Sequence, residues 1–373
     1  MVDELVSIKT SQTISSSSDA ESAGRVPQAR FLGVKYFLLL WLLFIAICFG
    51  LGYPTLHRYD PRKTEGLSDT FKYHATTTGA DFSVYIFKDL FRGRVLVPYV
   101  ARPFYWFAQK YLPRWNAGFF GLLMANALFC ATTACLIVSI GSRLVDLSIA
   151  LFGATLYLLS FAIPNLQLAG IIDSGEACFM IALTWSLLTG KWYLLPLWGL
   201  LGALAKETFV PFSFVFSFTW WLVERRRYDN QSSKLKWIIA LAIVGLATVS
   251  TVHTMISGQL RWPWQIADQA RAPVNFFIAL WHCLTEGSFW LVFGWLLPLG
   301  IWRLKFFPLA WRAASIATSV SAIMLGAYSN AGGTVGRATF DIIGPLLSLS
   351  AALLLARPFE VNEKNFAADH HAR

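Results

Sequence analysis

The chain contains repeated apolar runs, most of them long enough to cross a lipid bilayer. A transmembrane helix needs about 20 mostly apolar residues. Hydrophobic residues make up 56% of the 373-residue sequence and charged residues only 14%, well below the roughly 25% of an ordinary soluble domain. Too little polar surface remains to cover this many buried helices. The sequence therefore predicts an all-α, polytopic transmembrane helix bundle.

We expect about ten spans in this bundle. Two of them, 175–189 and 192–205, reach only about 21–23 Å at 1.5 Å per residue, which leaves extended, tilted or re-entrant helices open. The segment from Asn275 can form an interfacial helix before the eighth span. The expected spans are 34–53, 116–140, 145–163, 175–189, 192–205, 209–223, 237–256, 288–302, 313–328 and 338–356.

Basic residues set the expected orientation, because short cytoplasmic loops are enriched in Lys and Arg. The Ser-rich segment 1–30 is predicted to be a disordered cytoplasmic tail, 31–357 a transmembrane domain, and 358–373 a second cytoplasmic tail. Both termini then lie inside, and the loop 53–115 lies outside. Loops assigned inside carry Arg143, Lys191, Arg225, Arg226, Arg227, Lys234, Lys236, Arg303, Lys305 and Arg312, and those assigned outside carry Lys206, Arg261, Arg271 and Arg337.

Composition also limits the partners and cofactors that we expect for this chain. The net charge of +10 does not indicate nucleic acid, because the basic residues lie between apolar spans, where topology places them. The five cysteines lie in or beside apolar runs without CxxC spacing, as small core hydrophobes do. The histidines lack metal-ligand spacing, and no Gly-rich phosphate loop is present. No cofactor is predicted, and a divalent metal is possible without being indicated.

The loop 53–115 is the main candidate for a functional segment. Apart from the tails and 224–236, it is the most polar part of the chain. Its second half, 82–111, mixes aromatic and charged residues and is expected to form helices in the membrane interface. Ionisable residues at membrane depth are costly and mark functional sites by default. Those expected near the outer face are Asp69, Arg94, Asp173, Glu176, Lys206, Glu207, Arg337 and Asp341.

Each of these residues also has a purely structural interpretation. The neighbours Lys206 and Glu207 can pair or snorkel at the interface. Carboxylates at 173 and 176 favour a helix N-terminus electrostatically. Arg337 and Asp341 are four residues apart and can pair along one helix. Their origin in five separate parts of the chain, all on the predicted outer side, nevertheless indicates one outward-facing polar site.

The order of these residues is similar to that of a known family. An outer loop with Asp69-x-x-x-Tyr73 is followed by Arg94-Val-Leu-Val-Pro, then by a boundary Asp173. The sequence Ala-Lys-Glu-Thr at 205–208 and a last span opening Gly-Arg-Ala-Thr-Phe-Asp-Ile-Ile-Gly-Pro at 336–345 complete the pattern. Over about 34–356, the chain resembles the bacterial polytopic glycosyltransferases of the GT-C type, which include protein mannosyltransferases and lipid-A aminoarabinose transferases. The paired acidic motif of several members is missing unless Asp60 and Asp69 share its role.

The resemblance implies transfer of a sugar from a polyprenyl-phosphate donor at the outer face of a bacterial inner membrane. The acceptor is not identified by the residues. Asp69, with Asp60, would be the catalytic carboxylate, while Lys206, Arg337 and Arg94 would bind the donor phosphate. The supporting residues would be Tyr73, Asp173, Glu176, Glu207 and Asp341.

Two other functions stay open. The chain could be a transporter or flippase of envelope lipids or polysaccharide, or a non-catalytic membrane protein of envelope assembly. Transporters commonly place charges at the membrane midplane and contain internal repeats, whereas the charges here lie at one face and no repeat is evident.

Overall fold

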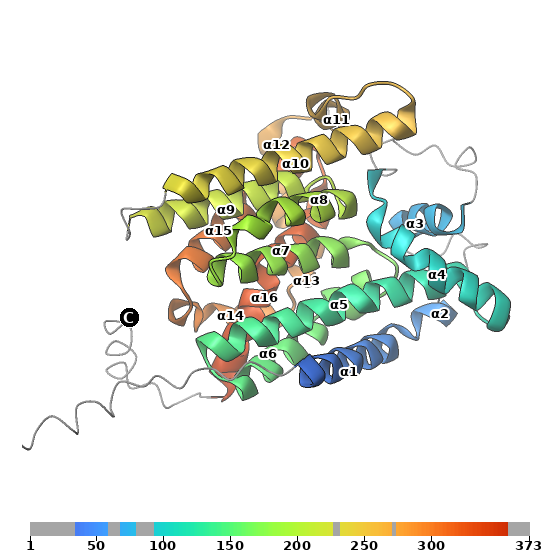
Figure 1. Cartoon of the computed structure of the whole chain (residues 1–373), viewed down its shortest axis with the longest axis horizontal. Coiled ribbons are helices and arrows are strands. Elements are labelled where there is room, and N and C mark those ends of the chain that lie inside the picture. Colours follow the sequence, from blue (N-terminus) through green and yellow to red (C-terminus); the bar gives the residue numbers. More distant parts are fainter. Residues whose placement is uncertain (1–33, 59–67, 80–92, 227–231, 271–273, 357–373) are drawn as a thin grey trace, which may run out of the picture.

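The structure is a computed structural model that describes residues 34–58, 68–79, 93–226, 232–270 and 274–356. Within these ranges the regular structure is entirely helical and no strand is present (Figure 1). The predicted all-α class is therefore confirmed. Asp60 lies outside the described residues.

The apolar runs of the sequence form helices close to their expected bounds. Local features fix some of the starts: Asn116 caps one helix by accepting the Phe119 N–H, and Asp146 caps the next by accepting the Ile149 N–H. The helices are α1 (Val34–Gly52), α5 (Ala117–Leu144), α6 (Leu147–Leu158), α7 (Asp173–Leu188), α8 (Leu195–Ala205), α9 (Phe209–Arg225), α10 (Ser232–Ser257), α15 (Leu309–Tyr328) and α16 (Val335–Ala356).

The eighth expected span, 288–302, is not one continuous helix. It forms α13 (Gly287–Leu291) and α14 (Leu296–Ile301), with α12 (Phe276–Thr285) before them. Gly294, between the two short helices, has a φ of 50°, a conformation that no right-handed helix contains. Pro298 then supplies no backbone N–H donor. The hydropathy of the sequence alone does not predict this break in the helix.

Five of the described helices are long and apolar enough to cross a membrane. They are the helices over Val34–Gly52, Ala117–Leu144, Ser233–Ser257, Leu309–Tyr328 and Gly332–Ala356. These helices are consistent with a multi-pass membrane protein. The count of about ten spans and the orientation of the termini stay predictions.

The outer surface of the bundle is apolar, as a lipid-facing surface is. On α1, Leu39 and Leu42 are 67% and 58% exposed, and on α12 Phe277 and Trp281 are 76% and 71% exposed. A water-soluble fold rarely exposes so much contiguous apolar area. The centre of the bundle is formed instead by α5, α7 and α16, whose residues are largely buried.

The described parts of the loop 53–115 cap one end of the bundle, which we call the α3 end. They form α2 (Thr55–Arg58), α3 (Ser68–Thr78) and α4 (Leu96–Tyr111), and α4 packs against both α3 and α5 (Figure 1). If adjacent helices alternate in direction, this end also contains the starts of α5, α7, α9 and α16 and the ends of α1, α8 and α10. The position of α4 relative to a membrane interface stays a prediction.

Helix α7 is much shorter than its neighbour α5. At 1.5 Å per residue, its 16 residues span about 24 Å and the 28 residues of α5 about 42 Å. The π-helical turn η4 (Ile163–Gln167) leads into α7. The first turn of α7 is consequently buried among longer helices rather than placed in solvent.

Replacing Gly121 by Ala should loosen α4 from α5. An added Cβ would lie 2.7 Å from the backbone oxygen of Ala101 in α4, so the helices must move apart, at a cost of about 1–3 kcal/mol. Gly50→Ala in α1 is the matched control, because a Cβ there meets nothing within 4 Å. Thermal unfolding in detergent should show a lower melting temperature for Gly121→Ala only. Equal melting temperatures would contradict the close α4–α5 packing.

Candidate functional site

A buried ion cluster joins α7 to the junction between α8 and α9. The Nζ of Lys206 donates to Asp173 Oδ1 at 2.9 Å and to Glu176 Oε2 at 2.6 Å. The Oγ1 of Thr208 donates to the other oxygen of Glu176 at 2.7 Å. The side chains of Lys206, Asp173 and Glu176 are 9%, 5% and 0% exposed. Charges this deeply buried persist only when they are paired.

This cluster arises from the ends of two consecutive helices. Asp173 and Glu176 occupy the first turn of α7, where a carboxylate also interacts favourably with the helix dipole. Lys206 directly follows the last residue of α8, in extended backbone that ends the helix. The short α7 and α8 therefore bring an acidic helix start and a basic helix end together inside the bundle.

A second group is built around Arg94, which lies two residues before the start of α4. Its Nε donates to Glu207 Oε2 at 2.9 Å and to Oε1 at 3.2 Å, and one Nη donates to the hydroxyl of Tyr73 at 2.9 Å. Burial alone would lower the pKa of Arg94, but the Glu207 carboxylate outweighs it and raises that pKa further above its usual range. Arg94 is therefore a fixed cation that links the loop 53–115 to the α8–α9 junction.

Asp69 and Arg337 form the most exposed part of the network. Lys72 Nζ donates to Asp69 Oδ1 at 2.9 Å, and Arg337 Nη2 donates to Asp69 Oδ2 at 3.4 Å. The Nε of Arg337 also lies 3.7 Å from Asp173 Oδ2. The side chains of Asp69 and Arg337 are each 22% exposed. Arg337 thus connects α3 to α7 from the first turn of α16.

The charge state of Asp69 follows from these neighbours. Burial raises the pKa of Asp69, but Lys72, Arg337 and Arg94 together outweigh burial and hold the pKa below its ordinary value. The carboxylate is therefore ionised at neutral pH. It can accept a hydrogen bond from an incoming hydroxyl.

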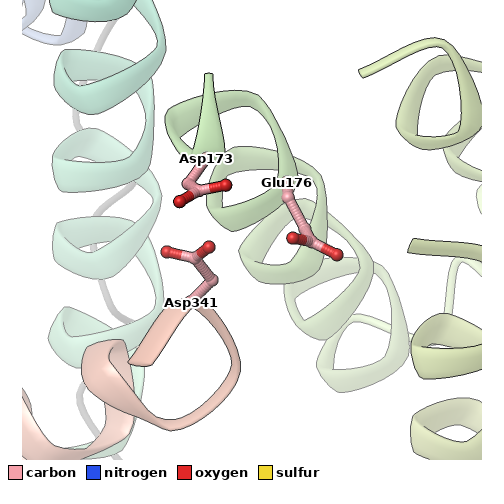
Figure 2. A group of neighbouring side chains, drawn as sticks. All are labelled: Asp173, Glu176 and Asp341. Carbon is pink, nitrogen blue, oxygen red and sulfur yellow. The ribbon is translucent and has the colours of Figure 1, made fainter. Parts of the chain in front are cut away.

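Asp341 lies one turn further along α16, facing the carboxylate of Asp173 (Figure 2). Its Oδ1 accepts from Gln167 Nε2 at 2.9 Å, and Gln167 in turn accepts a contact from the thiol of Cys130 at 3.2 Å. One oxygen from each of Asp173, Glu176 and Asp341 lies within 4.8 Å of the others. Carboxylates so spaced are candidates for a metal site, but the Lys206 ammonium already lies between two of them.

The structure joins all of the predicted site residues that it describes into one neighbourhood. Arg337 contacts Asp69 and Asp173 rather than Asp341, and Lys206 pairs with α7 rather than with Glu207. The alternative that Arg337 and Asp341 pair with each other along α16 is therefore not observed. The residues brought together are Asp69, Tyr73, Arg94, Asp173, Glu176, Lys206, Glu207, Arg337 and Asp341.

Sequence reasoning missed three contributors: Lys72, Gln167 and Thr208. Lys72 follows Asp69 at a helical spacing of three, which could have signalled the pair. Gln167 is an amide within an otherwise apolar stretch. Burying an amide without a hydrogen-bond partner is costly, so its position could have indicated a buried polar contact. Nothing in the sequence ties Thr208 to Glu176.

Comparison of the chain with models of known protein families gives no match, and comparison with curated proteins gives none either. The function of the chain is therefore inferred from the geometry of this network.

Replacing Lys206 by Met should strongly destabilise the protein. It leaves Glu176 buried without its cation and Asp173 with only the 3.7 Å contact to Arg337, a loss of about 3–5 kcal/mol. Lys234→Met is the control: Lys234 pairs with Glu224 at 3.4 Å and is 32% exposed, so its loss should cost about 0–1 kcal/mol. Melting temperatures in detergent measure both. Adding Glu176→Gln to Lys206→Met should recover part of the loss, and equal effects of the two lysine variants would contradict the account.

The Asp69 pairs should stabilise the fold in a pH-dependent way. Because the folded-state pKa of Asp69 lies below its ordinary value of 3.8, its contribution is complete above the unfolded-state pKa and disappears as pH falls through the folded-state pKa. The melting temperature of wild type should exceed that of Asp69→Asn at pH 6, and the two should converge in acid. A difference that grows as pH falls would show the opposite sign and refute the assignment.

Proposed function

We propose that the chain is a membrane glycosyltransferase that moves a sugar from a polyprenyl-phosphate donor to an acceptor at the α3 end of the bundle. One observation carries the proposal: an ionised carboxylate, Asp69, lies against a guanidinium, Arg337, where the ion network is partly exposed. Sugar transfer from a phosphate uses one group of each kind, with the anomeric carbon between them, so a bound donor would separate Asp69 from Arg337. The carboxylate engages the acceptor hydroxyl, and the cation stabilises the phosphate that leaves.

The transfer balances as a single displacement. The acceptor hydroxyl oxygen forms a bond to the anomeric carbon, and the bond from that carbon to the phosphate oxygen breaks. The phosphate keeps the electron pair and the lipid chain, next to Arg337. The hydroxyl proton passes to Asp69. A donor phosphate that engages Arg337 would also weaken its contact with Asp69, which would raise the pKa of this carboxylate and make it a better base.

The deeper residues have positioning roles in this mechanism. Lys206 is committed to Asp173 and Glu176, and Arg94 is committed to Glu207 and Tyr73. Each fixes an element of the site: Lys206 holds α7 beneath Arg337, and Arg94 holds the start of α4 beside α3. Arg337 is more exposed than Arg94 or Lys206, and it is therefore better placed than either to bind a phosphate.

The setting of the site agrees with a lipid-linked donor. The exposed residues Trp106 and Tyr111 on α4 and Trp281 on α12 are of the two aromatic types that favour a membrane interface. The distribution of Lys and Arg directs the α3 end outward. We therefore propose a multi-pass protein of a bacterial inner membrane, with both termini in the cytoplasm and the reaction on the outer face.

Asp69→Asn should lower sugar transfer by about 10²–10⁴-fold. The amide keeps the size of the side chain but cannot take the hydroxyl proton. The assay uses the purified full chain in lipid nanodiscs with a panel of radiolabelled polyprenyl-phosphate sugars and a bacterial envelope extract as acceptor. Glu224→Gln is the control, because Glu224 lies at the end of α9 remote from this network and contacts Trp220 and Lys234.

A parallel variant, Arg337→Gln, should reduce both donor binding and turnover, since the phosphate loses its cation. Asp60→Asn, made beside Asp69→Asn, tests the second loop carboxylate. Full transfer by Asp69→Asn at normal expression would overturn the mechanism. Uptake of the labelled donor into proteoliposomes without transfer would favour the transporter alternative.

A further inference from the structure

Asp341 is the one described carboxylate of the network without a directly contacting cation. Lys206 is bound by Asp173 and Glu176, Arg337 by Asp69 and Asp173, and Arg94 by Glu207. The direct side-chain partner of Asp341 is the neutral amide of Gln167, at 2.9 Å. Asp341 is nevertheless only 1% exposed. A fully ionised carboxylate at this depth would lack the compensation that buried charges need.

Two carboxylate oxygens in this part of the site have no hydrogen-bond partner among the described residues. They are Oδ2 of Asp173 and Oδ2 of Asp341, and both are buried. Figure 2 shows the two carboxyl groups directed toward each other, from the first turn of α7 and from α16. Two ionised carboxylates in this position would repel, with no solvent to screen them.

We propose that the Asp173–Asp341 pair holds one proton, so that Asp341 is a protonated acid that donates to Asp173. A single proton joins two oxygens, and one carboxylate oxygen of each aspartate has no hydrogen-bond partner among the described residues. Like-charged carboxyl groups at close range characteristically share one proton. The proton replaces a repulsion with a hydrogen bond and removes the uncompensated charge.

A metal ion fits the same oxygens less well. Mg²⁺ requires about six ligands and Ca²⁺ six to eight. Both oxygens of Glu176, the third carboxylate, already accept from Lys206 and Thr208. A divalent ion here would also have to displace or adjoin the Lys206 ammonium.

The groups around Asp341 come from several helices. Arg337 is on its own helix, Gln167 lies in η4, Tyr157 in α6 and Cys130 in α5. The titratable or charged groups facing the pair are Glu176, Lys206, Arg337, Arg94, Tyr73, Tyr157 and Cys130. Two of the cations, Lys206 and Arg337, contact Asp173, but none in the described part of the chain contacts Asp341, so none substitutes for the proton between the two carboxyl groups.

Infrared spectroscopy tests the proposal on the intact protein. The full chain is purified in detergent with ¹³C at the Asp carboxyl carbons only and measured at pH 7 in H₂O and D₂O. We expect a carbonyl band of a protonated Asp that shifts in D₂O. It should be lost in Asp341→Asn and kept in Asp69→Asn. Absence of the band in wild type overturns the proposal whether or not any variant folds, and a band that survives in Asp341→Asn overturns it too.

Stability gives a second readout that separates a proton from a charge or a metal. Asparagine resembles a protonated aspartic acid, so Asp341→Asn should melt at the wild-type temperature, whereas Asp173→Asn, which weakens the Lys206 and Arg337 pairs, should melt lower. Equal losses in both variants would overturn the proposal. So would a rise in melting temperature with MgCl₂, MnCl₂ or CaCl₂ that Asp341→Asn abolishes, because it would place a metal at the pair.

Discussion

The ion cluster of Lys206 with Asp173 and Glu176 is the interaction on which the α3 end of the bundle depends. Removing a charge from water costs several kcal/mol even after relaxation, so none of these side chains is tolerated alone at its depth. Their pairing forces the start of α7 against the end of α8. Glu207 and Thr208, the next two residues, are thereby directed to Arg94 and Glu176. The remainder of the network follows from that junction.

From this cluster the polar network becomes more exposed toward α3. Glu176 is inaccessible, Arg94 and Glu207 are 11% and 13% exposed, and Asp69 and Arg337 are each 22% exposed. Buried pairs of this kind fix geometry more than they add stability. They hold the Asp69 carboxylate and the Arg337 guanidinium in a fixed arrangement at the exposed edge of the network. Such preorganised groups are what acyl, phosphoryl and glycosyl transfer require, and the proposed sugar transfer uses them directly.

The sequence was informative where the physics is local. Hydropathy placed α1 and α7 within about two residues of their observed bounds, because burial of an apolar run depends on that run. The gathering of charges at one end could be anticipated, because alternate spans return to one side. Their partners could not, since the rotation and depth of α16 decide that Arg337 meets Asp69 rather than Asp341. The break at Gly294 and the role of Gln167 likewise depend on packing.

A cryo-electron microscopy structure of the protein in nanodiscs with a polyprenyl-phosphate sugar bound would test the proposed site most directly. We expect the donor phosphate on the Arg337 guanidinium, the anomeric carbon within reach of a hydroxyl held by Asp69, and Lys206 still between Asp173 and Glu176. A phosphate bound at the opposite end of the bundle, or at the α3 end without contact to Arg337, would contradict the proposed site.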